Sequence, residues 1–299
     1  MNYAIIDIGS NTIRMNVYRF ENQEIVTLFS KKETAGLVSY VSKKVMQPAG
    51  IKVLCETLQS FKEIVSHLKV DKISAFATAS LRNIKNTEEV LEKVKENTGI
   101  EINVLSVEQE GKLSFSGATY HTAHTDGLFI DLGGGSCEFV LFKNKETETV
   151  FSIPYGSLSL YNNYVENIIP TKEECHAIYN KFTSELRDFD PDKALSNDFL
   201  LGAGGTARAI AKILADHDMI GKATDSFDAS NMAKLIKSLY EKDIAHAILK
   251  CKANRIHTFI PGLITIIAII DYYHCKTMQI SNYGIREGYF HDEIVLNNL

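Results

Sequence analysis

Two stretches of the sequence, AIIDIGSNTIR at residues 4–14 and LFIDLGGGSCE at residues 128–138, decide the fold. Each contains an apolar run that ends in an acid, Asp7 or Asp131, and then a glycine turn and a second apolar run. A repeated arrangement carries more information than an isolated motif, because one structural unit has been used twice. The sequence therefore predicts a duplicated α/β fold in which each half begins with a β-hairpin.

The segments around these stretches extend the repeat, because a third strand follows each hairpin. The expected strands are Tyr3–Ile8, Thr12–Phe20 and Glu24–Ser30 in the first half, and Leu128–Asp131, Ser136–Phe142 and Glu148–Pro154 in the second. Polar residues 120–126 lie between the halves. We therefore expect one domain at residues 1–122 and another at 123–299, with the last helix packing back on the first domain.

Helical and strand patterns alternate through the rest of the chain, which is typical of sheets covered by helices. Helices are predicted at Ala49–Leu68, Thr87–Asn97, Thr171–Asp188, Thr206–Ala215 and Ala229–Leu249, and buried strands at Lys72–Thr78, Glu101–Leu105, Asp198–Gly202 and Met278–Ser281. Ser106 and Gln109 have the spacing of a capping box, in which each side chain bonds the other residue's backbone N–H. This places Glu110 in the first turn of a helix.

Composition indicates a compact α/β enzyme, with 45% hydrophobic and 23% charged residues. The net charge of −5 and the absence of a basic tail argue against duplex nucleic acid and a membrane surface, although a local cationic cleft could still hold a phosphate polymer. The opening MNYAIID has no basic segment before its apolar run, so we expect no targeting signal and a cytoplasmic protein. Five cysteines without CxxC spacing indicate reduced thiols.

The glycine turns predict phosphate binding, because glycine lets backbone N–H groups approach an anion closely. Gly133, Gly134, Gly135 and Ser136 form one such loop, and residues 9–11 form its counterpart. A tight hairpin turn is the alternative for either loop alone. A third glycine cluster, Gly202–Thr206, lies between a strand and a helix, where the positive helix end favours an anion. Its alternative is simple N-capping by Thr206.

The acids at the two strand ends predict a cation. A carboxylate at the end of an apolar strand is costly to bury unless it is hydrogen-bonded or faces a positive charge. Magnesium bridging phosphate oxygens is the natural partner of Asp7 and Asp131. The alternative is that each acid caps its own turn.

Taken together, these motifs resemble those of the Ppx/GppA phosphatases, which are the exopolyphosphatases and guanosine pentaphosphate phosphohydrolases of the actin-like ATPase superfamily. The motifs that carry the resemblance run in family order along the chain: Asp7–Arg14, Ala77–Arg82, Glu108–Leu113, Asp131–Glu138, Gly202–Thr206, Phe259–Leu263 and Ile285–Gly288. The resemblance implies a duplicated actin-like, ribonuclease H-like fold of two domains with an interdomain cleft. It is closest to the short form without an extra C-terminal module.

The resemblance also implies roles for individual residues. Glu110 matches the glutamate that activates the attacking water, and Asp131 and Glu138 match acids that bind the metal or shape the water site. Phosphate-binding positions are then Ser10, Asn11, Arg14, Arg82, Gly133, Gly134, Gly135, Ser136, Gly204, Gly205 and Thr206, and metal-binding positions are Asp7, Asp131 and Glu138. The cofactor is Mg²⁺, with Mn²⁺ as the alternative. Without the resemblance, Glu110 would be an acid favoured by the helix dipole, and Arg82 a surface salt bridge.

The resemblance implies that the protein is an exopolyphosphatase that releases orthophosphate from a chain end. A homodimer is compatible with the resemblance. Its ligands would be polyphosphate or guanosine penta- or tetraphosphate, and hydrolysis of guanosine pentaphosphate is the close enzymatic alternative. A kinase of the same superfamily would leave the segments around Arg82 and Glu110 without a role. Gln109, Gly111 and Lys112 depart from the family's usual pattern, so a non-catalytic sensor of polyphosphate or an alarmone is a further alternative.

Overall fold

A computed structural model describes residues 1–22, 24–221, 226–241 and 244–296. The chain divides into two compact units, the first made of Met1–Leu113 with Ile285–Leu299 and the second of Ser114–Gly284. The chain therefore passes from one unit to the other twice, whereas the domains expected from sequence are residues 1–122 and 123–299, with the last helix packing back on the first domain. The predicted junction at residues 120–126 lies inside the second unit.

The first unit opens with a β-meander and continues with alternating helices and strands. Its elements are β1 (Asn2–Ile8), β2 (Ile13–Glu21), β3 (Glu24–Glu33), a 3₁₀ turn (Leu37–Tyr40), β4 (Val41–Ser42), β5 (Val45–Met46), α1 (Pro48–His67), β6 (Lys72–Ala77), α2 (Ala79–Arg82), α3 (Thr87–Thr98), β7 (Ile102–Val104), the first part of α4 (Val107–Thr119), α11 (Ile285–Gly288) and a π-helical segment (Tyr289–Val295). The predicted strands and helices up to residue 105 are present, and their ends differ from the predicted ones by at most three residues.

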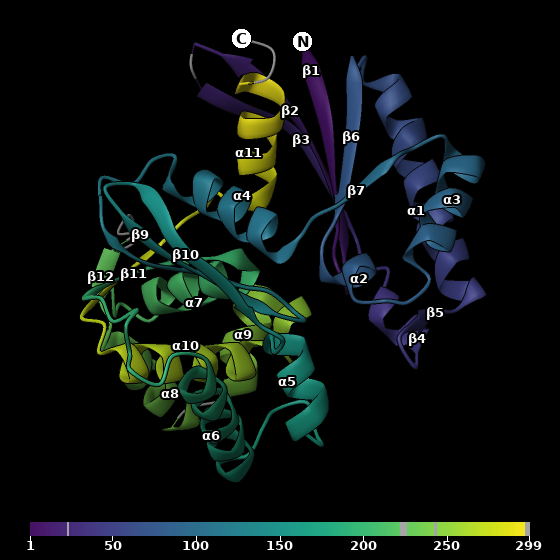
Figure 1. Ribbon diagram of the computed structural model, residues 1–299. Coiled ribbons are helices and arrows are strands. Elements are labelled where there is room, and N and C mark those ends of the chain that lie inside the picture. The colour runs from purple at the N-terminus through teal and green to yellow at the C-terminus, as the bar shows by residue number, and fades with distance from the viewer. Residues whose placement is uncertain (23, 222–225, 242–243, 297–299) are drawn as a thin grey trace. The chain divides into compact units, whose positions relative to one another are not determined.

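The main sheet of the first unit has the strand order β3-β2-β1-β6-β7, in which the hairpin strands are antiparallel and the later pairs parallel. Helices α1 and α3 cover one face (Figure 1). The other face receives the C-terminal segment, because Tyr18 stacks on Phe290 and Phe76 on Tyr289. Alternate residues along each strand therefore meet different helices.

The second unit repeats this order of elements with additional helices. Its elements are the remainder of α4, β8 (Gly127–Leu132), β9 (Cys137–Lys143), β10 (Glu146–Ile153), α5 (Ser157–Tyr164), α6 (Lys172–Phe189), β11 (Phe199–Ala203), α7 (Gly204–Asp216), β12 (Ser226–Asp228), α8 (Asn231–Glu241), α9 (Ile244–Lys252), a 3₁₀ turn (Ala253–Arg255), α10 (Phe259–Tyr273) and β13 (Thr277–Ile280). The helix predicted over Ala229–Leu249 is represented by α8 and α9, and residues 242–243 lie outside the described residues.

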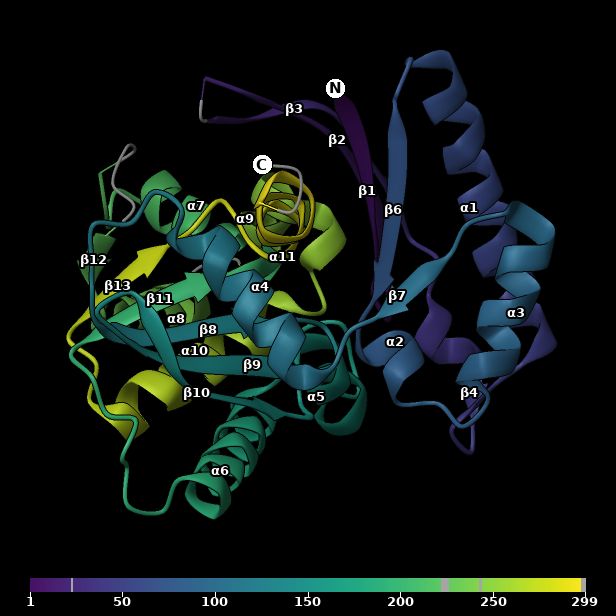
Figure 2. The ribbon, with the colours of Figure 1, turned by 45° about the horizontal axis from the view of Figure 1, so that its top comes forward.

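The sheet of the second unit has the order β10-β9-β8-β11-β13-β12. Most of its helices pack on one face, where Leu128, Ile130 and Phe139 join a large apolar core. The other face is covered by the end of α4 (Figure 2), where Phe115 contacts Phe129 and Phe142. Asp131 and Glu138 alternate with the core residues of β8 and β9, so they lie on the α4 face.

The two hairpins have the same cross-strand register, which agrees with the predicted duplication. In the first, Asp7 is opposite Arg14 and Ile8 opposite Ile13; in the second, Asp131 is opposite Glu138 and Leu132 opposite Cys137. In both units the first strand of the hairpin then pairs in parallel with a later strand, β6 or β11. The predicted duplicated α/β fold class is therefore confirmed.

Two further sequence expectations concern composition. The four cysteines whose side chains the structure describes, Cys55, Cys137, Cys175 and Cys275, are free thiols; the side chain of Cys251 lies outside the described residues. None of the described helices combines the length and the apolar content needed to cross a membrane.

Candidate functional site

The turn of the first hairpin leaves consecutive donors available. Gly9 N donates to Thr12 O at 3.1 Å and closes the turn. The carbonyl oxygens of Ser10 and Asn11 accept from the backbone of residues 38 and 36, each at 2.9 Å, which fixes the loop from behind. Among the described residues, the backbone N–H groups of Ser10, Asn11 and Thr12 have no acceptor. Such a run of N–H groups is suited to an anion.

Asp7, at the end of β1, is held by a cation. Arg286 Nη1 of α11 donates to Asp7 Oδ2 at 3.0 Å, and both side chains are largely buried. The sequence predicts a cation beside this carboxylate, with magnesium as the expected partner. In the structure an arginine stands at that place, and Arg286 belongs to the Ile285–Gly288 motif.

The second hairpin has the same turn geometry. Gly133 N donates to Ser136 O at 3.0 Å, and the N–H groups of Gly134, Gly135 and Ser136 have no acceptor among the described residues. The carbonyl oxygens of Gly133 and Gly134 accept from the first N–H groups of α5, at 2.9–3.0 Å. The carbonyls are thus turned toward α5, and the loop's remaining N–H groups form a run that is suited to an anion.

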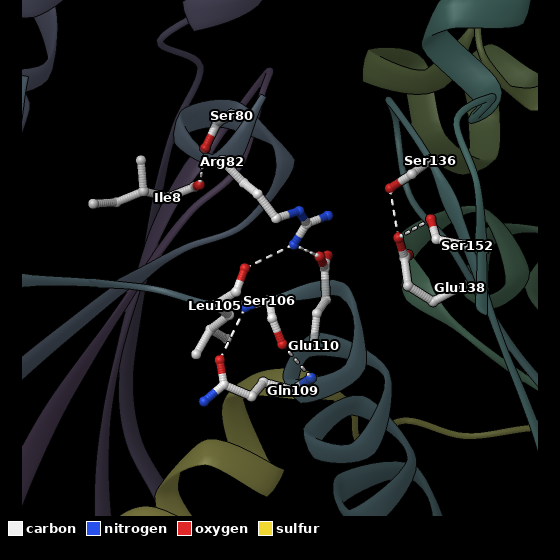
Figure 3. Close-up of polar contacts among 10 residues, drawn as sticks. All are labelled: Ile8, Ser80, Arg82, Leu105, Ser106, Gln109, Glu110, Ser136, Glu138 and Ser152. Carbon is white, nitrogen blue, oxygen red and sulfur yellow. Dashed lines mark hydrogen bonds and ion pairs between the residues drawn. The ribbon is translucent and has the colours of Figure 1, made fainter. Parts of the chain in front are cut away.

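Two carboxylates accompany the second hairpin on the α4 face of its sheet. Ser114 of α4 donates to Asp131. Glu138 is almost completely buried and accepts from Ser136 Oγ at 2.6 Å and from Ser152 Oγ at 3.0 Å (Figure 3). Because Asp131 and Glu138 are directly opposite on neighbouring strands, their side chains are cross-strand neighbours. In the part of the chain that the structure describes, the carboxylate of Asp131 accepts from Ser114 and not from the N–H groups of its own turn.

Glu110 occupies the first turn of α4 in the first unit, as predicted. The capping box is present, with Ser106 N donating to Gln109 Oε1 at 2.9 Å and Gln109 N donating to Ser106 Oγ at 3.1 Å. Arg82 Nη1 donates to Glu110 Oε2 at 2.6 Å and to Leu105 O at 2.9 Å (Figure 3). The side chains of this pair are 17% and 11% exposed, so Arg82 is not the surface salt bridge considered as its alternative.

The third glycine cluster forms the start of a helix rather than a loop before it. Helix α7 begins at Gly204, and its N-cap is Ala203. Thr206 therefore lies inside the first turn and is fully buried, where it cannot be the N-cap. The N–H groups of the first helical residues, which include Gly204, Gly205 and Thr206, have no partner within their own helix. The alternative of N-capping by Thr206 is wrong, since the N-cap is Ala203. Anion binding at this helix start stays a prediction.

Gly204 has a specific steric role beside Asp131. Its φ is +92°, and a Cβ there would lie 2.8 Å from Asp131 Oδ1 and 2.9 Å from Leu132 O. We expect Gly204→Ala to lower the free energy of unfolding by about 1–3 kcal/mol, because the new side chain is strained and displaces a carboxylate. Denaturant unfolding measures the change. Gly284→Ala is the control, since its Cβ would meet nothing closer than 3.9 Å; equal losses in both variants would contradict the assignment.

Arg255 is a site residue that the sequence analysis missed. Its guanidinium lies over Gly205, where a Cβ would come within 2.0 Å of Nη2, and Nη1 donates to Thr206 Oγ1 at 3.1 Å. Burial, together with the neighbouring Arg208, lowers the pKa of Arg255. A single arginine in a short link between helices gives no periodic signal, so its position could not be read from the sequence. It adds positive charge at the start of α7.

The three carboxylates predicted to bind a divalent cation are not equally suited to it. Within the part of the chain that the structure describes, no three His, Cys, Asp or Glu side chains are grouped to hold a metal ion. Magnesium commonly uses one or two protein carboxylates together with substrate phosphates. Asp131 and Glu138, opposite each other on β8 and β9, fit that requirement. Asp7 fits it less well, because Arg286 already holds its carboxylate.

Comparison with known proteins identifies the family. A model of the Ppx/GppA phosphatase family matches residues 16–296. The chain belongs to the Ppx/GppA phosphatase family. A relative named putative exopolyphosphatase, from Haemophilus influenzae, is 26% identical over 95% of this chain and 89% of its own length. A relative named guanosine-5'-triphosphate,3'-diphosphate pyrophosphatase, from Vibrio vulnificus, is 28% identical over 96% of this chain, which spans only 58% of that relative.

Solved structures of Ppx/GppA proteins have the same fold. An exopolyphosphatase from Cytophaga hutchinsonii gives a TM-score of 0.86 at 21% identity, with 100% of this chain and 99% of the other covered. The Aquifex aeolicus Ppx/GppA protein gives 0.82 at 23% identity, with the same coverage. The family predicted from the sequence is thus confirmed, and the predicted class of enzyme, a phosphoanhydride hydrolase, agrees with a family of phosphatases.

Proposed function

We propose that this Ppx/GppA protein hydrolyses the terminal phosphoanhydride bond of inorganic polyphosphate and releases orthophosphate. The observation that carries the proposal is the duplicated hairpin, because both copies leave a run of backbone N–H groups without an acceptor in the described residues. A structural turn requires only the bond that closes it. A polyanion with many equivalent phosphate groups is a ligand suited to such runs of N–H groups.

Glu110 is the group we propose to activate water. Its carboxylate is buried at the start of α4, and Arg82 fixes one oxygen at 2.6 Å. A carboxylate held in this way has a second oxygen that can accept a proton from water. Glu110 then orients a water molecule and takes its proton as the water oxygen attacks the terminal phosphorus atom. The bond from this phosphorus to the bridging oxygen breaks, and the shortened polyphosphate leaves with that oxygen. Phosphoryl transfer needs little more from a protein than this positioning and charge neutralisation.

Arg82 and the loops are the groups we propose to bind phosphate oxygens. Arg82 uses Nη1 for Glu110 and Leu105, and a guanidinium carries five N–H donors in all. Arg14, Ser10 and Asn11 belong to the first hairpin, Gly133–Ser136 to the second, and Gly204–Thr206 to the start of α7. These groups bind the nonbridging oxygens without forming a covalent bond to the substrate.

A divalent cation, Mg²⁺ or alternatively Mn²⁺, completes the proposal. Asp131 and Glu138 would hold it, and it would neutralise charge that develops on the phosphate oxygens. Ser114 orients Asp131, while Ser136 and Ser152 orient Glu138. These hydroxyl groups donate to the carboxylates without cancelling their charge, which keeps both acids suitable as metal ligands.

Hydrolysis of guanosine pentaphosphate is the second candidate, because relatives named for that activity and a relative named for polyphosphate are similarly close to this chain. Both substrates present a terminal phosphoanhydride. The sensor alternative was based partly on Gln109, whose side chain caps α4 in the structure. A glutamate at this position would cap the helix in the same way, so the capping bond does not explain the departure from the usual acid.

A phosphate-release assay tests the proposal. The pure protein is incubated with polyphosphates of defined length, guanosine pentaphosphate and ATP, each with Mg²⁺ and with EDTA. We expect Mg²⁺-dependent orthophosphate release, with kcat/KM highest for polyphosphate. A higher kcat/KM for guanosine pentaphosphate would select the second candidate. Tight binding without release from any substrate would support a sensor and overturn the enzyme.

A further inference from the structure

The duplicated hairpins can be compared position by position, and they differ in charge. Asp7 and Asp131 occupy the same position, and so do their cross-strand partners Arg14 and Glu138. The first hairpin therefore carries an acid and a base, whereas the second carries two acids. Two neighbouring carboxylates attract a cation, while an acid beside a base does so far less.

The side chains that contact Asp7 and Asp131 from the covering helices also differ in charge. In the first unit Arg286 of α11 forms an ion pair with Asp7. In the second unit Ser114 of α4 donates a hydroxyl to Asp131, and no cationic side chain pairs with Asp131 in the described residues. The corresponding carboxylate is thus neutralised in the first unit and remains available in the second.

Arg286 is held in place by a buried hydrogen-bonded chain on the same face of the sheet. Tyr18 donates to Glu287, the neighbour of Arg286 in α11. Asn16 Nδ2 donates to Tyr18 Oη at 2.6 Å, and Ser30 Oγ donates to Asn16 Oδ1 at 2.8 Å. Tyr18 and Glu287 are buried. This chain fixes α11 on the sheet and with it the direction of the Arg286 side chain.

Arg286 retains the capacity to donate. Its buried Nε has no hydrogen-bond partner among the described residues, which is uncommon for a buried donor. Burial disfavours the charged form of Arg286, but Asp7 and Glu287 outweigh it, so the pKa stays above its usual value. Lys32 of β3 is opposite Arg14 of β2, which in turn is opposite Asp7. Asp7, Arg14 and Lys32 are therefore cross-strand neighbours on one face of the sheet, and two of the three are cations.

We infer that the first hairpin is a metal-free phosphate site, in which Asp7 anchors Arg286 as a phosphate-binding residue and the Tyr18–Glu287 pair positions it. The divalent cation is then held by carboxylates of the second unit alone. This inference rests on the proposed function for the nature of the ligand. It changes the role of Asp7 from the metal ligand expected from the sequence to the anchor of an arginine.

Binding of linear tripolyphosphate in EDTA, measured by calorimetry, tests the role of Arg286. We expect Arg286→Met to weaken binding at least about tenfold, the size of one lost charged hydrogen bond, and Arg286→Lys to restore part of it. Arg19→Met is the matched control, because Arg19 pairs with exposed Glu21 on the same strand. Unchanged affinity in Arg286→Met would overturn the inference. If this variant fails to fold, the double variant Asp7→Asn/Arg286→Met, which removes both buried charges, replaces it.

Manganese binding to the substrate-free protein, measured by the spin resonance signal of free Mn²⁺, tests the role of Asp7. We expect Asp7→Asn to bind Mn²⁺ as the unaltered protein does, and Asp131→Asn to bind it much more weakly. Loss of Mn²⁺ affinity in Asp7→Asn equal to that in Asp131→Asn would show Asp7 to be a metal ligand and overturn the inference.

A double-mutant cycle tests whether Tyr18 acts through Arg286. Tyr18→Phe removes only the hydroxyl that reaches Glu287, and we expect it to weaken tripolyphosphate binding. In the Arg286→Met background the same change should have no further effect, because residues that act through one another are not additive. Equal effects in both backgrounds would mean that Tyr18 has a merely structural role. None of these measurements requires turnover, so they remain decisive if the protein proves not to release phosphate.

Discussion

Replacing Glu110 with glutamine is expected to lower kcat by about 10²–10⁴-fold, the range that a positioned general base contributes. The amide has nearly the same shape and keeps a carbonyl oxygen for Arg82, but it cannot take a proton from water. We therefore expect the KM for polyphosphate and the affinity for tripolyphosphate to change little. Steady-state phosphate release and calorimetry on the same preparation measure both quantities.

The matched control for Glu110 lies two residues earlier on the same helix. Glu108 is exposed and forms an i, i+4 ion pair with Lys112 at 2.6 Å. Such a pair contributes little to stability, so Glu108→Gln should retain full turnover. If Glu110→Gln kept the turnover of Glu108→Gln, Glu110 would not be the base, and Arg82 would become the remaining candidate for organising the water.

The second large effect is expected for Asp131→Asn. The amide still accepts from Ser114 but lacks the charge that holds a divalent cation. Charge stabilisation by a bound metal is worth several kcal/mol, so we expect kcat/KM to fall by about 10²–10³-fold at a fixed low Mg²⁺ concentration. The Mg²⁺ concentration for half-maximal activity should rise, and excess Mg²⁺ should restore part of the rate.

Asp126→Asn is the control for that substitution, because Asp126 is exposed, and its carboxylate accepts from Thr125 and the backbone N–H of Asn144. Its Mg²⁺ dependence should match that of the unaltered protein. An unchanged Mg²⁺ requirement in Asp131→Asn, with a low rate at every concentration, would remove Asp131 from the metal site and leave it a role in shaping the loop.

The hairpins and the helix start at Ser106 could be predicted from sequence because the interactions that form them are local. A glycine turn between apolar runs closes within a few residues, and a capping box joins residues three apart. The helix carrying Glu110 begins where that pattern placed it. The start of α7 was less certain, because glycines are compatible with either a loop or a first helical turn.

The partners of the acids could not be predicted, since they come from elements distant in the sequence. Arg286 and Asp7 are 279 residues apart, and Tyr18 and Glu287 are 269 apart. No periodic pattern links residues at such separations. The sequence indicated that a buried acid needs a positive partner, but only the packing of α11 determines that an arginine supplies it. The same reasoning applies to Ser114 and Asp131, which are joined by the path of α4.

The return of residues 285–296 to the first unit bears on how each unit is stabilised. Residues 114–284 form a compact unit by themselves, whereas the first unit is completed by Glu287 and Phe290, which follow the second unit in the chain. Tyr18 and Phe76 gain the aromatic partners that cover them only when this segment returns. A variant that ends at residue 284 should therefore protect its second unit from protease better than its first, because only the first loses part of its packing.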